Sequence, residues 1–178
     1  AVHEDLIQFY AYLHPIVDLQ DARDYVTRLR QVDTKIDQLI EGLEIRKEVG
    51  IKPPQFAIEW AVYGSLGQFV GTSARSNVLY TRFKEKVDTL SGGTPQELQA
   101  ALDDAYQAID DVVLPAYAKL NQYLQDYPTY AGEDSGVWRL PQGAESYDYL
   151  LAHHTTTELS AEDIHQLVGV ASLFAEWD

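Results

Sequence analysis

The sequence predicts an all-α fold, an irregular bundle of about six helices that includes one long helix kinked by a proline. Three observations support this prediction. Apolar residues recur at spacings of three and four, strand-like alternation is nowhere sustained, and a capping box opens the longest helical stretch. Since domains typically hold roughly 100–200 residues, the 178 residues are expected to form a single helical domain, or a segment of a larger one, over residues 1–178.

The first amphipathic stretch covers residues 22–49, where apolar side chains form one stripe along a helix. Asp18 or Asp21 can cap its start, and Gly50 can end it in the left-handed conformation that glycine accepts. One long helix and two helices joined near residues 33–34 fit this pattern equally well.

The next helix follows two prolines, which favour extended backbone before it and place Pro54 at its first position. One apolar face is expected from Phe56 through Trp60 to Phe69. Three glycines in this stretch either weaken the helix by about 1 kcal/mol each relative to alanine or permit close helix approach. These glycines are Gly64, Gly67 and Gly71.

A shorter helix is expected over residues 77–90, and the longest predicted helix runs over 95–126. Thr94 and Glu97 have the capping-box spacing, with a proline between them at the first helical position. Pro115 must kink the long helix, because it removes one backbone hydrogen bond and clashes with the carbonyl four residues earlier.

Prolines and glycines then make residues 127–143 irregular. A short helix carrying Tyr147 and Tyr149 is expected next. Ser160 caps a last helix, with acidic residues in its first turn.

The composition excludes several functions. The chain carries 28 acidic against 13 basic residues, a net charge of −15, which argues against nucleic acid and anionic membranes as partners. It lacks cysteine, which excludes thiol catalysis and cysteine-ligated zinc. No apolar run is long enough to cross a membrane, so no membrane contact is expected. The aspartate pairs at 103–104 and 110–111 indicate a solvated acidic stripe, since catalytic carboxylate pairs need burial to separate their pKa values.

The five histidines are expected at the surface or in loops, not on a metal. His3 and Glu4 begin like a His-Glu-x-x-His zinc motif, but Ile7 stands where the second histidine should be. His154 and His165 have no partner histidine at helical spacing. No metal ligand and no catalytic residue is therefore assigned to this chain.

The most unusual local composition is two histidines followed by three threonines at residues 153–157. Consecutive threonines are poor helix residues, so one interpretation is an inter-helix connector whose hydroxyls satisfy backbone donors. The other is an exposed polar wall that binds substrate, with His154 donating to a carbonyl or carboxylate. The residues assigned to this substrate-binding wall are Tyr149, His154, Thr155, Thr156 and Thr157. Four tyrosines around the irregular region could also line a groove, namely Tyr127, Tyr130, Tyr147 and Tyr149.

Several segments resemble the bacterial DUF885 family, a group of unknown function related to gluzincin-type zinc metallopeptidases. They follow one another in the family's order and spacing, and the resemblance covers nearly the whole chain up to Leu167. These segments are Asp21–Leu29, Gly50–Phe56, Val113–Tyr117, Gly136–Gly143, Tyr149–Leu151, His154–Thr157 and Ile164–His165.

The resemblance implies a helical, non-catalytic segment of a metallopeptidase-like domain, because the family's zinc motif follows the His-Thr-Thr-Thr segment and has no counterpart here. Zinc is expected only in a full-length parent, in which residues 127–159 would form one wall of a cleft for a peptide substrate. Secretion and lipoprotein signals in the family imply an extracytoplasmic parent. A chain that begins with Ala1 and lacks methionine is expected to be processed, excised or the product of a truncated gene.

Two alternatives remain. One is a self-standing helical binding or assembly module that forms homo-oligomers through exposed apolar helix faces. The other is an enzyme of a different class that uses tyrosine, histidine and carboxylates. That enzyme would need His154 in a concave pocket beside an acidic residue.

Overall fold

The computed structural model describes residues 2–129 and 136–167, and within these the chain is helical with no strand, as predicted. It divides into two compact units, residues 1–130 and 131–178. Three helices of the first unit stand by themselves, namely α2 (Leu19–Leu29), α3 (Val32–Glu48) and α6 (Val78–Asp88). The others contain a π-helical piece. They are α1 (Val2–Gln8) continued by η1 (Phe9–Leu13), α4 (Gln55–Glu59) continued by η2 (Trp60–Leu66) and α5 (Gly67–Val70), and α7 (Pro95–Ala108) continued by η3 (Ile109–Val113) and α8 (Leu114–Gln125). The second unit holds the short η4 (Val137–Arg139), α9 (Gly143–Thr155) and a helical stretch over 161–167.

Local chemistry sets most of the helix ends. The Asp18 carboxylate accepts from the Asp21 backbone N–H (2.9 Å) and caps α2. Thr94 and Glu97 form the expected reciprocal capping box at the start of α7. Gly50 follows α3 with φ of +81°, the left-handed conformation expected of it. Residues 22–49 form two helices, and the break lies at residues 30–31, slightly before the expected position.

Pro54 was expected inside the following helix but is its N-cap, with extended backbone, so that α4 begins at Gln55. The cap position suits proline because its residue lies outside the hydrogen-bonded turns and needs no N–H.

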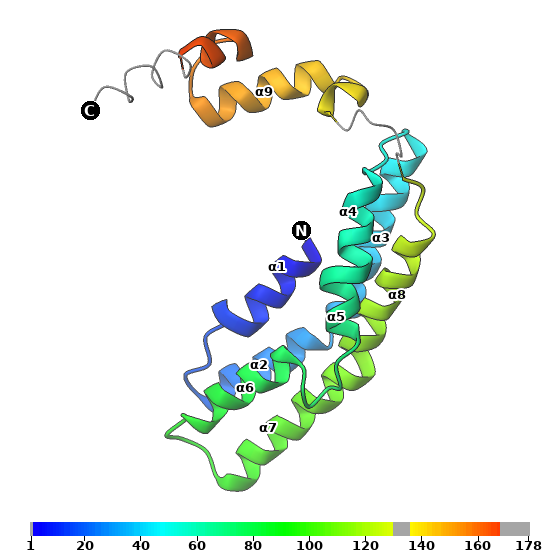
Figure 1. The fold of residues 1–178 in the computed structure, drawn as a ribbon. Coiled ribbons are helices and arrows are strands. Elements are labelled where there is room, and N and C mark those ends of the chain that lie inside the picture. The colour runs from blue at the N-terminus through cyan, green and yellow to red at the C-terminus, as the bar shows by residue number, and fades with distance from the viewer. Residues whose placement is uncertain (1, 130–135, 168–178) are drawn as a thin grey trace, which may run out of the picture. The chain divides into compact units, whose positions relative to one another are not determined.

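The long helix α7–η3–α8 is the structural axis of the first unit (Figure 1). Pro115 lies just after the π-helical turn of η3. Proline cannot donate to the carbonyl four residues earlier and its ring crowds that carbonyl, and a wider π turn at this point relieves the clash. The structure thus has a π turn at this point, and the predicted kink stays a prediction.

The other helices pack along this axis. Figure 1 shows α2 and α6 beside α7, and α3, α4 and α5 beside α8. The apolar core lies between them, and the largest fully buried side chains include Tyr25, Phe83, Tyr117 and Leu120. The rings of Tyr25 and Phe83 stack with centroids 4.6 Å apart, and the Tyr25 hydroxyl donates to the Leu79 carbonyl (3.1 Å), which satisfies this buried phenol.

Gly67 is required by the π-helical turn of η2. A Cβ atom at this position would lie 2.6 Å from the carbonyl oxygen of Val62, in its own helix. The glycine therefore makes room for a carbonyl of the widened turn within its own helix, a role that neither sequence interpretation of these glycines included.

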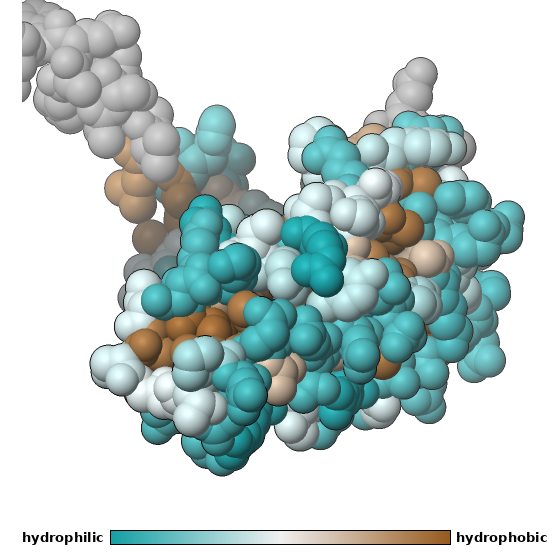
Figure 2. Space-filling model, turned by 90° about the horizontal axis from the view of Figure 1, so that it is seen from below, coloured by the Kyte–Doolittle hydropathy of each residue, from teal (hydrophilic) through white to brown (hydrophobic). Residues whose placement is uncertain are grey.

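The surface is largely hydrophilic on the face shown in Figure 2, where apolar residues reach the surface only in separate patches. The aspartate pairs at 103–104 and 110–111 are exposed along the long helix, as expected of a solvated stripe. Asp104 meets the Arg30 guanidinium at 3.1 Å between exposed side chains, and such pairs contribute roughly 0–1 kcal/mol.

In the second unit, α9 carries Tyr147 and Tyr149 as predicted. The stretch 161–167 begins with a capping box. The Ser160 hydroxyl accepts from the Asp163 N–H (3.2 Å), and the Asp163 carboxylate accepts from the Ser160 N–H (3.1 Å). Residues 130–135, in the middle of the expected irregular segment, lie outside the described part of the chain.

Candidate functional site

The residues predicted to bind substrate lie at the C-terminal end of α9. Tyr149 is 69% exposed, and its ring stacks on that of His153 with centroids 6.1 Å apart. The His153 ring in turn meets His154 edge-on at 5.2 Å. Since Tyr149 and His153 are four residues apart on a helix, they share one face. Three exposed rings therefore form a continuous row on α9.

The threonines continue this row beyond the helix end. The Thr155 hydroxyl donates to the Leu151 carbonyl (2.8 Å) and lies 3.0 Å from the Thr157 hydroxyl. Thr156 adopts φ of +55°, which is unusual for a β-branched residue. The Thr155 hydroxyl thus binds a backbone carbonyl, not the backbone donors that the connector interpretation expected, and the Thr156 and Thr157 side chains are exposed. Substrate binding by this wall stays a prediction.

The exposure of His154 counts against an acid–base enzyme built on it. The His154 ring contacts His153, and among the interactions of the described residues no carboxylate approaches it. A general acid or base needs an oriented partner and a concave surrounding. The described contacts of His154 do not supply either feature.

The four tyrosines are divided between different parts of the chain, and the groove that they were expected to line stays a prediction. Tyr127 is buried in the first unit, where its hydroxyl donates to the Leu43 carbonyl (2.8 Å). Tyr147 and Tyr149 belong to α9 in the second unit, and Tyr130 lies outside the described residues.

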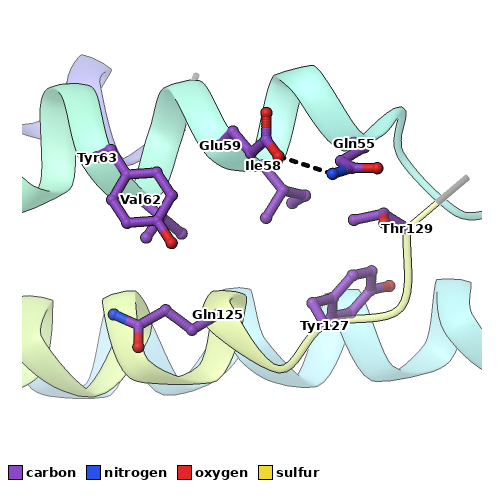
Figure 3. A pocket seen from close by; sticks show the side chains of 8 residues that line it. All are labelled: Gln55, Ile58, Glu59, Val62, Tyr63, Gln125, Tyr127 and Thr129. Atoms are coloured by element: carbon purple, nitrogen blue, oxygen red, sulfur yellow. Dashed lines mark hydrogen bonds between the residues drawn. The ribbon is translucent and has the colours of Figure 1, made fainter. Parts of the chain in front are cut away.

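Tyr127 lines a groove within the first unit, whose other lining residues were not identified from the sequence (Figure 3). The groove has a volume of about 260 Å³ and lies between the start of α4–η2 and the residues that end and follow α8. Within it the Gln55 amide donates to the Glu59 carboxylate (2.7 Å), and Tyr63 faces Gln125 across the gap. The lining is Gln55, Ile58, Glu59, Val62, Tyr63, Gln125, Tyr127 and Thr129. Its groups are mostly uncharged hydrogen-bonding side chains. The only feature of the local sequence that relates to this groove is the four-residue spacing of Gln55 and Glu59, which allows their side chains to bond on one helix face.

The helix over 55–70 also departs from the expected single apolar face. Val62, Leu66 and Phe69 are buried, but Phe56 and Trp60 are exposed. The expectation of one inward face was therefore wrong for these two aromatic residues, which lie on a different side of the helix.

Two histidines expected at the surface or in loops are buried. His3 is 7% exposed, its Nε2 lies 3.1 Å from the Ser65 hydroxyl, and its carbonyl accepts from the Tyr117 hydroxyl (2.8 Å). His14 is 3% exposed and bonds to Arg28. Burial lowers the pKa of both imidazoles, so both favour the neutral form. His153, His154 and His165 are exposed, as expected.

The described residues do not fit a zinc site. Over 2–129 and 136–167, no three histidine, aspartate or glutamate side chains come together in a way that could hold a metal ion. Over the same ranges, no helix has both the length and the apolar character needed to cross a membrane.

Comparison with known proteins gives the family. No curated protein matches the chain. Among solved structures, the chain is similar to one described as "the putative lipoprotein from Colwellia psychrerythraea", with 25% identity and a TM-score of 0.84. The match covers 91% of this chain and 28% of that one, so the chain spans little more than a quarter of the solved relative's length. A family model described as "Bacterial protein of unknown function (DUF885)" matches residues 1–173, past the expected limit at Leu167. The chain therefore belongs to the DUF885 family.

Proposed function

We propose that this chain is a helical, non-catalytic part of a DUF885 domain, in which the end of α9 forms one wall of a peptide-binding cleft. The observation that supports this most is the exposed row of Tyr149, His153 and His154 followed by threonine hydroxyls. The first unit, with its buried core, would then act as scaffold.

The chemistry of the row suits an extended peptide. Exposed hydroxyls and imidazole nitrogens can both donate to peptide carbonyls and accept from peptide N–H groups. The stacked rings of Tyr149 and His153 offer an apolar surface to peptide side chains. The left-handed Thr156 turns the chain sharply after the helix, which leaves the end of the row open.

In this proposal, zinc binding and the cellular location are properties of the full-length parent protein. The family resemblance implies a zinc-dependent hydrolase, whose metal would be held outside the described residues. The solved relative's description as a lipoprotein supports an extracytoplasmic location for the parent.

Photo-cross-linking tests the cleft wall, because it captures weak contacts. A pool of random hexapeptides that carry a diazirine leucine would be irradiated with the chain, and mass spectrometry would locate the adducts. We expect adducts to concentrate on residues 149–157, and the double variant Tyr149→Ala/His154→Ala to lower their yield at least fivefold. The control Tyr12→Ala removes an exposed tyrosine from the first unit and should leave the yield unchanged.

Adducts spread evenly over the surface, or insensitive to the double variant, would count against the cleft wall. In the same samples the chain alone should not cleave the peptides. Cleavage that a chelator stops would contradict the non-catalytic part of the proposal.

A further inference from the structure

The helix over 55–70 has apolar residues on two faces, and only one of them is covered. Val62, Leu66 and Phe69 pack into the core. Phe56, Trp60 and Tyr63, which we term the aromatic stripe, are 65%, 73% and 77% exposed. A helix that is apolar on most of its circumference is typical of one enclosed by protein on all sides.

The aromatic stripe lies beside a groove. Phe56 and Trp60, four residues apart, line this groove together, and Tyr63, within the π-helical η2, lies on the neighbouring flank that faces Gln125. Gly64 adds no side chain beside Trp60, since a Cβ atom there would lie 3.9 Å from the indole ring. Between the stripe and α1 lies an apolar groove of about 550 Å³, lined by His3, Glu4, Phe56, Ala57, Trp60 and Ala61.

Each buried aromatic side chain removes roughly 150–250 Å² from water, so three adjacent ones make a patch of several hundred Å². Patches of this size generally mark interaction sites. Single exposed apolar residues elsewhere on the chain need no such explanation.

We propose that the aromatic stripe and its groove dock a further part of the DUF885 domain, supplied by polypeptide of the kind that the solved relative carries beyond the matched region. The argument rests on length. The chain matches that relative closely in fold but covers only 28% of it, so most of the relative's polypeptide is available to pack on such a face. The proposal is independent of the cleft wall on α9.

Charge makes a second copy of this chain the less suitable occupant. Each copy carries a net charge of −15, and Glu4 and Glu59 lie beside the stripe. Pairing two identical stripes would bring these carboxylates and the overall charges together, which opposes association. An apolar helix face with basic residues around it fits the site better.

Hydroxyl-radical footprinting tests the proposal. It would compare the chain alone with a chimera in which these 178 residues replace the matched region of the Colwellia protein. We expect Phe56, Trp60 and Tyr63 to be oxidised rapidly in the chain alone and at least fivefold more slowly in the chimera. If the chimera does not fold, an equimolar mixture of the chain with the separately expressed remainder of that protein should show the same protection.

A paired substitution separates docking from general destabilisation. Trp60→Ser/Tyr63→Ser should leave the melting temperature of the chain alone unchanged and lower that of the chimera. Ile45→Ser/Val49→Ser, which removes two exposed apolar residues at the C-terminal end of α3 and its C-cap, should change neither.

Two outcomes would overturn the proposal. One is equal oxidation of the stripe in the chain alone and in both combined samples. The other is protection in the chain alone that grows with concentration as sedimentation reports a dimer, which would identify a second copy as the occupant. Because the peptide cross-linking uses the chain alone, failure of either proposal leaves the other testable.

Discussion

His14 shows how surrounding groups fix the protonation of one buried side chain. Its Nδ1 lies 2.8 Å from the Pro15 carbonyl and can only donate to it. Its Nε2 lies 2.8 Å from the Arg28 guanidinium and can only accept from it. The His14 carbonyl also accepts from the Lys86 ammonium at 2.8 Å. A proton added to Nε2 would therefore face two cations, and the fold selects the neutral imidazole.

This geometry predicts a pH dependence of stability. Burial, together with Arg28 and Lys86, lowers the pKa of His14 below its usual 6.5. Below pH 6.5 the unfolded chain binds a proton that the folded chain does not, so the free energy of unfolding should fall as the pH falls. Urea unfolding at pH 7.5 and 5.0 measures this, and His14→Gln should show a smaller loss between the two.

The exposed His153 provides the control for this prediction. His153→Gln should lose as much stability on acidification as the unchanged chain. His3, whose pKa is also lowered by burial, accounts for part of the loss that remains in His14→Gln. An identical loss in His14→Gln and in the unchanged chain would contradict the role given to His14.

The burial of these histidines was not predictable from local sequence. The partners of His3, Ser65 and Tyr117, lie 62 and 114 residues away along the chain. Neither histidine lies on a regular apolar stripe, and burial of a polar side chain depends on whether distant segments supply its hydrogen bonds. The exposed side chains at residues 149–157, in contrast, were predictable from the sequence, because consecutive polar residues and neighbouring aromatic rings are local properties of the chain.

At the scale of single elements, glycine is necessary at residue 67, where the π turn of η2 ends, but not at residue 42 in the regular helix α3. Gly67→Ala should lower the free energy of unfolding by about 1–3 kcal/mol, because the added methyl meets the Val62 carbonyl. Gly42→Ala in α3 meets only the flexible end of Arg46, at 3.5 Å, and should raise stability by about 0.5–1 kcal/mol. Chemical denaturation of the two variants should therefore give opposite signs. A gain in stability for Gly67→Ala would contradict the π turn.

Helix ends were more predictable than helix faces. The capping box at Thr94 and the glycine stop at Gly50 depend on neighbouring residues, and both are present. Phe56 and Trp60 were assigned to the single apolar face because one periodic pattern was expected over the whole helix. Two interleaved patterns occur instead, one through Val62 and Leu66 and the other through Phe56 and Trp60. The π-helical η2, which contains residues of both patterns, changes the angular spacing of side chains, and an ideal helix projection cannot reproduce it.

At the scale of the whole molecule, the apolar core belongs to the first unit. Every buried apolar residue of the described chain lies between Tyr10 and Tyr127. A polypeptide of residues 1–130 should therefore fold alone and melt cooperatively within a few degrees of the complete chain. Calorimetry of both would measure this. Loss of the cooperative transition in the shorter chain would show that the second unit is needed for folding.

The bond between Tyr117 and the His3 carbonyl also has a consequence for synthesis. It joins α1 to α8 across 114 residues, so α1 has no partner on α8 until that helix has been made. Chain elongation at about 5–20 residues per second puts this interval at roughly 6–23 s. During it α1 lacks its contact with α8, and a nascent chain that pauses before residue 117 should be a preferred client of chaperones that bind exposed helices.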